Sequence, residues 1–317
     1  MSTDEEMLVF AGSGSPQLTA KICQTLAISV RIGETVRFSD GNLMVRIGEN
    51  VRGRHVYLVQ STAVPANDNF MELLFWIDAF KRSSAESVTV LMPYFSYAKG
   101  DKKDEPRVSI RARVCADAIQ VAGADRVVTL DLHAAQIQGF FTVPVDDLYA
   151  LPVLVNALRD KKLVDPIVVS PDVGFAKKAR KFATALNCSL AIADKERAGH
   201  DESAEVLEII GDVEGKAAVV VDDFTISGGT LCDVAQKLLD RGAREVHVAV
   251  SHGVFGEGAM ARIDASPIDT FLVTDSVETQ PEPLGSKIQV VSVSGLFAEA
   301  IRRIHRRESI SVLFENP

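Results

Sequence analysis

The sequence predicts an α/β protein with mainly parallel sheets, organised as two similar domains. Short runs rich in β-branched residues alternate along the chain with segments whose apolar residues recur at three- and four-residue spacing. This is the pattern of parallel strands covered by helices on both faces. The runs in the second half are almost continuously apolar, as is typical of strands buried on both faces. The 317 residues also exceed the usual domain length of roughly 150 residues.

Each β-branched run is expected to be a strand, and each segment of helical spacing a helix. The expected strands are residues 8–11, 55–59, 87–92, 126–130, 167–170, 189–193, 217–221, 245–250, 269–273 and 288–291. The expected helices are residues 68–84, 110–122, 174–186, 230–241 and 293–306. A proline-containing connection at 149–152 separates two such series, which places an N-terminal domain at 1–149 and a C-terminal domain at 150–292.

Composition excludes several classes of protein. The apolar fraction of 47% and the charged fraction of 24% are ordinary for soluble globular proteins, so disorder, collagen and disulfide scaffolds are excluded. Lys and Arg number 34 against 43 Asp and Glu, a net charge of −9 that repels a phosphate backbone. We therefore expect no nucleic-acid partner, and any anionic substrate has to be held by local basic residues or backbone N–H groups.

The cysteines and the N-terminus indicate a cytoplasmic protein. Cys23, Cys115, Cys188 and Cys232 are far apart and form no CxxC pair, so we expect neither a zinc site nor a redox motif. The first residues are acidic and precede no signal-like apolar stretch. No run approaches the roughly 20 apolar residues of a membrane span, so no membrane partner is expected.

The most informative segment follows the expected strand at 217–221. Two carboxylates come first, then a turn of small residues and then a helix. Glycine N–H groups, hydroxyl donors and a helix N-terminus together suit a bound phosphate, while the carboxylates suit ribose hydroxyls or a metal. The plainer alternative is an acidic strand end before a helix N-cap. The residues concerned are Asp222, Asp223, Ile226, Ser227, Gly228, Gly229 and Thr230. No GxxxxGK[ST] motif is present, so a P-loop is not indicated.

This segment resembles the phosphoribosyl diphosphate binding signature that phosphoribosyltransferases share with ribose-phosphate diphosphokinases. Other segments resemble the diphosphokinases alone, and they extend in order over essentially the whole chain. They are residues 38–41, 65–74, 93–95, 131–141, 146–150, 170–172 and 309–314. From them the chain is identified as a member of the ribose-phosphate diphosphokinase family. A phosphoribosyltransferase would not explain the segments at 131–141 and 38–42, and a catalytically silent regulatory homologue would not need the intact set of acidic and basic residues.

The resemblance implies transfer of the β,γ-diphosphoryl group of ATP to the 1-hydroxyl of ribose 5-phosphate, with Mg²⁺ and release of AMP. His133 and Asp172 match the metal position. The histidine assignment depends on the resemblance alone, because Mg²⁺ generally prefers oxygen ligands. Lys195 and Arg197 match the basic residues brought over the transferring group, and 198–203 reads as a mobile loop beside them. In isolation these residues would read as a solvated charged run.

The resemblance also implies how the substrates are held. Ribose 5-phosphate is assigned to Arg197, to the carboxylates and to the small-residue turn described above. The diphosphate loop is Asp172, Val173, Gly174 and Phe175, with Phe175 where the family usually has a second glycine. ATP is assigned to Phe38, which stacks on adenine, and to Asp40, Gly41, Asn42, Lys99 and Gly100. Asn42 stands in place of a common Glu, and Lys99–Gly100 in place of Arg-Gln, so we expect a relaxed nucleotide preference.

Regulation and assembly are also implied only by resemblance. Ile226 replaces a common aspartate, a feature of the plant-type subgroup, which is typically independent of inorganic phosphate and lacks allosteric inhibition by ADP. Residues matching the regulatory anion site of the phosphate-activated class are nevertheless present: Arg52, Ser84, Arg107, Ser309 and Ser311, with Asn50 in place of a serine. We expect two similar phosphoribosyltransferase-type domains with the active site between them. The segment 293–317 is expected to complete the first domain. The resemblance also implies a homo-oligomer built from dimers, commonly a hexamer.

Overall fold

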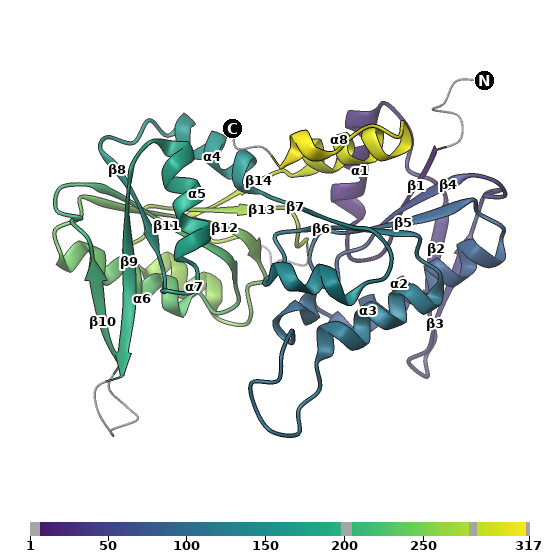
Figure 1. The fold of residues 1–317 in the computed structure, drawn as a ribbon, viewed down its shortest axis with the longest axis horizontal. Helices are drawn as coiled ribbons and strands as arrows, with labels where there is room; N and C mark the ends of the chain where they lie inside the picture. The colour runs from purple at the N-terminus through teal and green to yellow at the C-terminus, as the bar shows by residue number, and fades with distance from the viewer. Residues whose placement is uncertain (1–6, 198–204, 279–283, 315–317) are drawn as a thin grey trace. The chain divides into compact units, whose positions relative to one another are not determined.

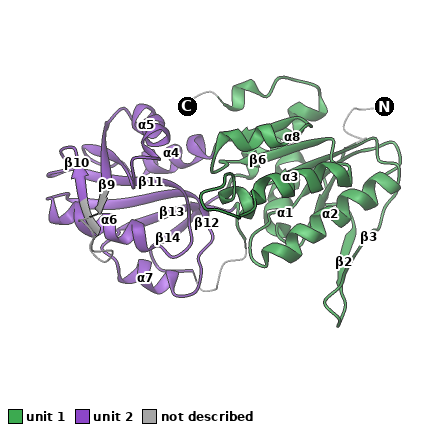
Figure 2. Ribbon diagram, turned by 60° about the horizontal axis from the view of Figure 1, so that its bottom comes forward, with its two compact units in different colours: residues 1–149, 276–279, 292–315 green, residues 150–275, 280–291, 316–317 purple. Residues whose placement is uncertain are grey.

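The computed structural model of the chain describes residues 7–197, 205–278 and 284–314. The chain divides into two compact units (Figure 2). Unit 1 comprises residues 1–149, 276–279 and 292–315, and unit 2 comprises residues 150–275, 280–291 and 316–317. No described helix is long and apolar enough to cross a membrane.

Unit 1 contains a five-stranded sheet in which every neighbouring pair is parallel. Its order is β1 (Met7–Ala11), β4 (His55–Val59), β5 (Ser87–Met92), β6 (Arg126–Leu130) and β7 (Val145–Leu148). Parallel strands all end at the same edge, so the segments that follow β4, β5 and β6 leave the sheet side by side.

Helices cover both faces of this sheet (Figure 1). On one face lie α2 (Ala66–Arg82) and α3 (Arg111–Ala122), whose buried apolar residues join those of β4 and β5 in one hydrophobic core. On the other face lie α1 (Pro16–Leu26) and α8 (Ser294–His305), which pack against each other. Side chains of a strand alternate between faces, so the nearly continuous apolar runs supply both layers.

A separate antiparallel hairpin lies beside α2, formed by β2 (Gly33–Arg37) and β3 (Leu43–Ile47) (Figures 1 and 2). The sequence did not predict it, because both strands are short and β2 is polar and largely exposed. α1 and β7 were not predicted either, and in unit 2 the same holds for α4 (Leu151–Asp160), β10 (Glu205–Ile210) and α7 (Ala259–Ala265).

Unit 2 contains a seven-stranded sheet that is parallel except for one edge strand. In order, the strands are β10, β9 (Ser189–Arg197), β8 (Pro166–Ser170), β11 (Ala217–Thr225), β12 (Glu245–Gly253), β13 (Thr270–Thr274) and β14 (Ile288–Val291). Only the β10–β9 pair is antiparallel. The predicted α/β class with mainly parallel sheets is confirmed.

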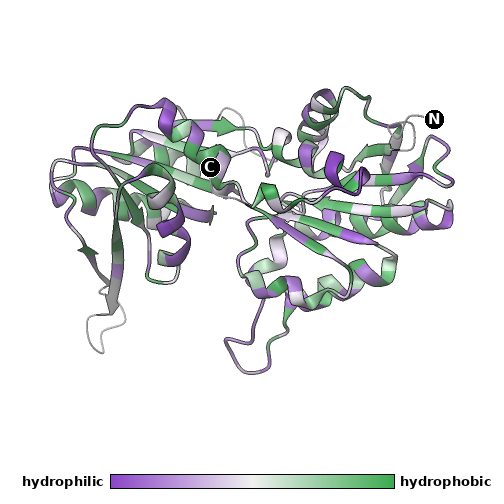
Figure 3. Ribbon diagram, turned by 45° about the horizontal axis from the view of Figure 1, so that its top comes forward, coloured by the Kyte–Doolittle hydropathy of each residue, from purple (hydrophilic) through white to green (hydrophobic). Residues whose placement is uncertain are grey.

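The helices of unit 2 also form two layers. α6 (Gly229–Asp240) and α7 share a core with the central strands, while α4 packs against α5 (Ala176–Leu186). Figure 3 shows hydrophobic residues along the central strands and hydrophilic residues recurring along the helices. This two-sided covering explains why β8, β11 and β12 are almost wholly buried.

Among the predicted boundaries that were wrong near the candidate site are the end of β11 and the start of α5. β11 continues to Thr225, so Asp222 and Asp223 lie within the strand rather than after it. The cause is pairing with the equally long neighbour β12, in which Phe224 lies opposite His252. α5 begins at Ala176, not at residue 174, because a side-chain turn closes the preceding loop.

Candidate active site

The small-residue turn after β11 is shaped by Gly228. Its φ is +71°, a left-handed conformation that side chains rarely adopt, and a Cβ there would lie 3.0 Å from Cγ1 of Ile263. The Gly228 N–H donates to Oγ1 of Thr225 at 3.2 Å, and the Gly229 N–H donates to Oγ of Ser227 at 3.3 Å. Glycine is therefore required here both by the backbone and by the close packing of α7.

Contacts from the β12–α7 region hold this turn in place. The Arg262 guanidinium donates to the Ser227 carbonyl at 2.8 Å, and the Gly256 N–H donates to the Ile226 carbonyl at 2.8 Å. The side chains of Ile226, Ser227 and Thr230 remain exposed. The turn therefore presents its side chains to solvent on a backbone fixed from behind.

The two aspartates before the turn form an acidic, poorly solvated pair. Asp223 is buried, and its N–H donates to Oδ1 of Asp222 at 2.9 Å. Burial raises the pKa of Asp222 well above its ordinary value, and the charges of Asp223 and Asp172 raise it further. Cations or hydroxyl donors would relieve this accumulation of negative charge, so the pair is suited to ribose hydroxyls or to a metal–substrate complex.

The segment Asp172, Val173, Gly174 and Phe175 leaves β8 at the same edge of the sheet, because β8 pairs in parallel with β11. The Phe175 N–H donates to Oδ1 of Asp172 at 2.8 Å, which closes the loop before α5. Asp172, Val173 and Gly174 are exposed, whereas Phe175 is buried. Figure 1 shows β8 and β11 near α5.

Lys178 on α5 connects this loop to the acidic pair. Its Nζ lies 3.7 Å from Oδ2 of Asp223 and 5.6 Å from the centre of the Phe175 ring. Phe175, which stands in place of the family's second glycine, thus adds a cation–π contact to a lysine that also faces a buried carboxylate.

The strand that carries the two candidate catalytic residues runs beside β8. The sequence predicted its end at residue 193, but β9 continues through Lys195 to Arg197 and pairs there with β10. β9 is parallel to β8, so residues 195–197 approach the same edge as the diphosphate loop. The predicted mobile loop at 198–203 lies outside the described residues.

Within unit 1, Phe38, Asp40, Gly41 and Asn42 form the tip of the β2–β3 hairpin. The Phe38 N–H donates to the Asn42 carbonyl at 2.9 Å, and the Asn42 N–H donates to Oδ1 of Asp40 at 3.0 Å. Gly41 has a φ of +88°. The Phe38 side chain is 48% exposed, so an aromatic ring is presented at the tip of a tight turn.

The other unit 1 residues follow neighbouring strands β5 and β6. Lys99 ends a short 3₁₀ helix, η2 (Ser96–Lys99), and is half-buried. Gly100 is buried under the Arg111 side chain, and a Cβ there would lie 2.6 Å from Nε of Arg111. His133 follows β6 and is exposed. The sheet therefore brings Lys99 and His133 to the same edge of unit 1.

The proposed metal residues are one in each unit, His133 in unit 1 and Asp172 in unit 2. Across the described ranges, no group of three or more His, Cys, Asp or Glu side chains is arranged to hold a metal ion. A Mg²⁺ ion that is held mainly by substrate phosphates and waters needs only a few protein ligands. The exposed Asp172 carboxylate, close enough to raise the pKa of Asp222, is a donor of the right chemistry.

The chain is similar to known proteins over its full length. Residues 7–123 match a family profile described as the N-terminal domain of ribose phosphate pyrophosphokinase, and residues 200–315 match the phosphoribosyl synthetase-associated domain. A ribose-phosphate pyrophosphokinase of Burkholderia pseudomallei is 46% identical, with 99% of each chain covered. The chain belongs to the ribose-phosphate pyrophosphokinase family. The predicted family membership is confirmed.

Further relatives agree with this assignment. A ribose-phosphate pyrophosphokinase of Rhizobium meliloti is 47% identical over 98% of this chain and 100% of its own length. The crystal structure of phosphoribosylpyrophosphate synthetase from Mycobacterium smegmatis matches with a TM-score of 0.90 at 34% identity, covering 95% of this chain and 99% of that one. The two-domain phosphoribosyltransferase-like α/β fold is thus shared with this family.

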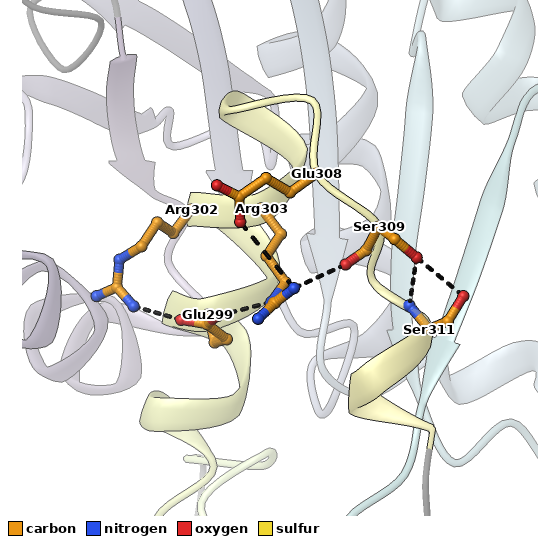
Figure 4. Close-up of polar contacts among 6 residues, drawn as sticks. All are labelled: Glu299, Arg302, Arg303, Glu308, Ser309 and Ser311. Atoms are coloured by element: carbon orange, nitrogen blue, oxygen red, sulfur yellow. Dashed lines mark hydrogen bonds and ion pairs between the residues drawn. The ribbon is translucent and has the colours of Figure 1, made fainter.

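The residues that the resemblance assigns to a regulatory anion site lie on four segments of unit 1, at 50–52, 84, 107 and 309–311. Near the C-terminus, Oγ of Ser309 donates to Oγ of Ser311 at 3.0 Å, and Arg303 donates to the Ser309 carbonyl at 2.9 Å (Figure 4). Elsewhere, the Arg52 N–H donates to Oδ1 of Asn50 at 3.1 Å. Asn50 thus uses its amide oxygen for a local backbone turn.

Sequence reasoning missed Arg262, which holds the small-residue turn, and Arg111, which covers Gly100. Neither carries a local signal, since Arg262 lies on an unpredicted helix of seven residues. Of the four cysteines, Cys23, Cys115 and Cys232 are buried and Cys188 is partly buried. Burial raises the pKa of the Cys23 and Cys115 thiols to about 11, which makes them poor nucleophiles.

Proposed function

We propose that the chain catalyses transfer of the β,γ-diphosphoryl group of ATP to the 1-hydroxyl of ribose 5-phosphate, giving 5-phosphoribosyl 1-diphosphate and AMP, for nucleotide biosynthesis. The observation that carries this proposal is the match over the full chain to ribose-phosphate pyrophosphokinases. The acidic pair beside a glycine turn at the carboxyl edge of the unit 2 sheet supports it, since ligands of open α/β sheets bind at such edges.

In this reaction the ribose 1-oxygen forms a bond to the β-phosphorus, and the bond from that phosphorus to the bridging oxygen of AMP breaks. We assign the 5-phosphate to residues 226–230 and the ribose hydroxyls to Asp222 and Asp223, which accept their hydrogen bonds. Lys195 and Arg197 would stabilise the charge that spreads over the transferring group. Ordering both reactants in one orientation supplies much of the rate enhancement.

We assign ATP to Phe38 and the turn it begins, and its phosphates to the segment with Lys99 and Gly100. Kinase-type enzymes of this family generally need a divalent metal, and we propose Mg²⁺, held with the ATP phosphates by His133 and Asp172. When bound, the ion neutralises phosphate charge. Asn42 lacks the carboxylate that would accept from the adenine amino group, so a relaxed nucleotide preference is part of the proposal.

We propose regulation of the plant type, which is independent of inorganic phosphate. The proposal rests on the ribose-phosphate turn, in which the uncharged and exposed Ile226 replaces an aspartate common in the family. We also propose a homo-oligomer built from dimers, with the hexamer that is common in the family as the assembly to test. Light scattering of the purified chain measures the number of subunits.

The deciding experiment measures AMP formation from ATP and ribose 5-phosphate with Mg²⁺, with and without inorganic phosphate and over a range of ADP. Ribose-dependent AMP without added phosphate supports both the activity and the phosphate-independent regulation. A strict phosphate requirement supports the activity but overturns that regulation. Folded protein that forms no AMP under any condition overturns the activity and favours a silent regulatory homologue.

A further inference from the structure

Three aligned contacts join β2 to α2, the helix along which β3 also packs. Side chains of a strand alternate between its two sides, so positions 33, 35 and 37 of β2 share one side. Positions 68, 72 and 76 of α2 are spaced by four residues and so form one stripe along the helix. The contacts pair Gly33 with Trp76, Thr35 with Glu72, and Arg37 with Asp68.

The contact at the hairpin base is one of close packing. A Cβ at Gly33 would lie 2.5 Å from Cη2 of Trp76, so the backbone of β2 lies directly on the indole. Trp76 is itself buried and stacks on Phe80 with ring centres 5.4 Å apart. The base of the hairpin is therefore fixed against the rigid core of unit 1.

The middle contact connects the hairpin to a buried carboxyl group. Glu72 is fully buried, and its Oε1 accepts from Oγ1 of Thr35 at 2.6 Å. The same oxygen accepts from the N–H of Ser13 at 2.9 Å, from Oγ of Ser13 at 3.0 Å and from Nε1 of Trp76 at 3.2 Å. Oε2 is buried without a hydrogen-bond partner among the described residues. Of these four donor groups, the Thr35 hydroxyl is the one that belongs to the hairpin, so this bond joins β2 directly to the buried carboxyl group.

The outer contact lies directly before the nucleotide turn. Nη1 of Arg37 is 2.5 Å from Oδ2 of Asp68, and the next residue along the chain is Phe38. Both side chains are nearly half exposed, so this ion pair contributes little energy in water. It orients the tip, whereas the buried middle contact supplies the stronger restraint.

The hairpin is also restrained by β3, which packs along α2. Among the described strands, β2 and β3 pair only with each other and form a sheet of their own. Val45 and Ile47 of β3 pack against the α2 core, but apolar packing alone allows sliding and rocking. The three aligned contacts therefore add directional restraints to this packing at the strand that leads into the turn at 38–42.

We propose that Thr35 and Glu72 are positioning residues for the nucleotide-binding turn, acting through the aligned contacts between β2 and α2. This inference rests on the proposed function, because it takes the turn at 38–42 to hold ATP. Neither residue is assigned a contact with substrate. Both limit the motion of Phe38, so their loss should weaken ATP binding without affecting ribose 5-phosphate.

The test compares Thr35→Val, which removes the hydroxyl but keeps the branched shape, with Thr35→Ser, which keeps the hydroxyl. AMP formation is measured in the full chain with ATP and ribose 5-phosphate varied separately. For Thr35→Val we expect the KM for ATP to rise about three- to tenfold, as for a lost hydrogen bond, with kcat and the KM for ribose 5-phosphate unchanged. Thr35→Ser should behave as the natural chain.

Glu34→Gln provides a matched control within the same strand. Glu34 points to the other side of β2 and pairs with Arg46 of β3 at 2.9 Å, so its change alters the hairpin but not its contact with α2. We expect its KM for ATP to stay at the natural value. A rise equal to that of Thr35→Val would overturn the inference, because any disturbance of the hairpin would then suffice.

Hydrogen exchange separates this inference from the proposed function. Amides of residues 33–47 should exchange faster in Thr35→Val than in Thr35→Ser, while those of the five-stranded sheet remain unchanged. This readout needs no turnover, so it stands even if the natural chain forms no AMP, a result that removes the proposed function. Unchanged exchange together with an unchanged KM for ATP overturns the positioning role.

Discussion

Nζ of Lys178 lies 3.7 Å from Oδ2 of Asp223, which joins the first turns of α5 to the end of β11. The carboxylate is buried and the lysine is about one-third exposed, so the pair places positive charge where the diphosphate and ribose assignments meet. The Phe175 ring holds the same ammonium from a second side. A lysine shared by an aromatic face and a carboxylate has less freedom than one in solvent.

Replacing Lys178 by methionine should therefore impair the use of ribose 5-phosphate. Without the ammonium, Asp223 loses a counter-charge in a poorly solvated position, and we expect kcat/KM for ribose 5-phosphate to fall about tenfold. Steady-state assays with ATP saturating measure this. Lys178→Arg keeps the charge and should restore most of the activity. Equal losses in both variants would show that the shape of lysine, rather than its charge, matters.

A pH dependence follows from Asp222. Burial and the neighbouring carboxylates raise its folded-state pKa above the unfolded value, so the folded chain binds more protons between the two values. The stability that this group contributes is therefore greatest at acidic pH and falls as pH rises from about 4 towards neutrality. Asp222→Asn should be more resistant to denaturant than the natural chain at pH 7, with the difference shrinking towards pH 4.

Denaturation midpoints measured between pH 4 and pH 8 test this dependence. Glu245→Gln is a suitable contrast, because a hydrogen bond from the adjacent Arg244 lowers the pKa of Glu245. Removing this carboxylate should therefore destabilise the folded chain at neutral pH. A pH-independent difference for Asp222→Asn would contradict the proposed origin of the effect. Loss of ribose 5-phosphate use in a stabilised variant would show that this carboxyl group is retained for function.

Most strands could be predicted because their apolar runs are buried on both faces. The run Ala217–Val221 identified β11, but its continuation through two aspartates could not be seen locally, since it depends on the ladder with β12. The hairpin was missed for the opposite reason. β2 is polar and exposed, and its stability comes from α2, thirty or more residues along the chain.

The candidate site likewise contains residues that could be predicted from the sequence and residues that could not. Gly228 and the aspartates could be identified because acidic and glycine residues are unusual after a buried strand. Arg262, Glu72 and Thr35 could not, because each acts on a segment distant in sequence, through contacts that only the topology brings about. Residues required by local backbone geometry leave a sequence signal, whereas residues that position them from another element do not.

Gly228→Ala should damage both stability and the use of ribose 5-phosphate. A left-handed φ costs an alanine about 1–2 kcal/mol, and its Cβ would lie 3.0 Å from Ile263. Gly215→Ala is the matched control, since Gly215 has nearly the same φ of +70° and a Cβ there meets nothing within 4 Å. Both variants should lose stability to denaturant, but only Gly228→Ala should raise the KM for ribose 5-phosphate. Equal KM values in the two variants would contradict a binding role for this turn.

Arg262→Met should loosen the ribose-phosphate turn from behind while leaving its own residues intact. The lost bond is the one from the guanidinium to the Ser227 carbonyl, at 2.8 Å. We expect the KM for ribose 5-phosphate to rise about three- to tenfold, with the KM for ATP unchanged. Arg241→Met removes a comparable bond to the Ile209 carbonyl, at 3.1 Å, away from the turn, and should change stability alone. If both arginine variants raised the KM for ribose 5-phosphate equally, general loosening of unit 2 would explain the result and the specific support of the turn by Arg262 would be wrong.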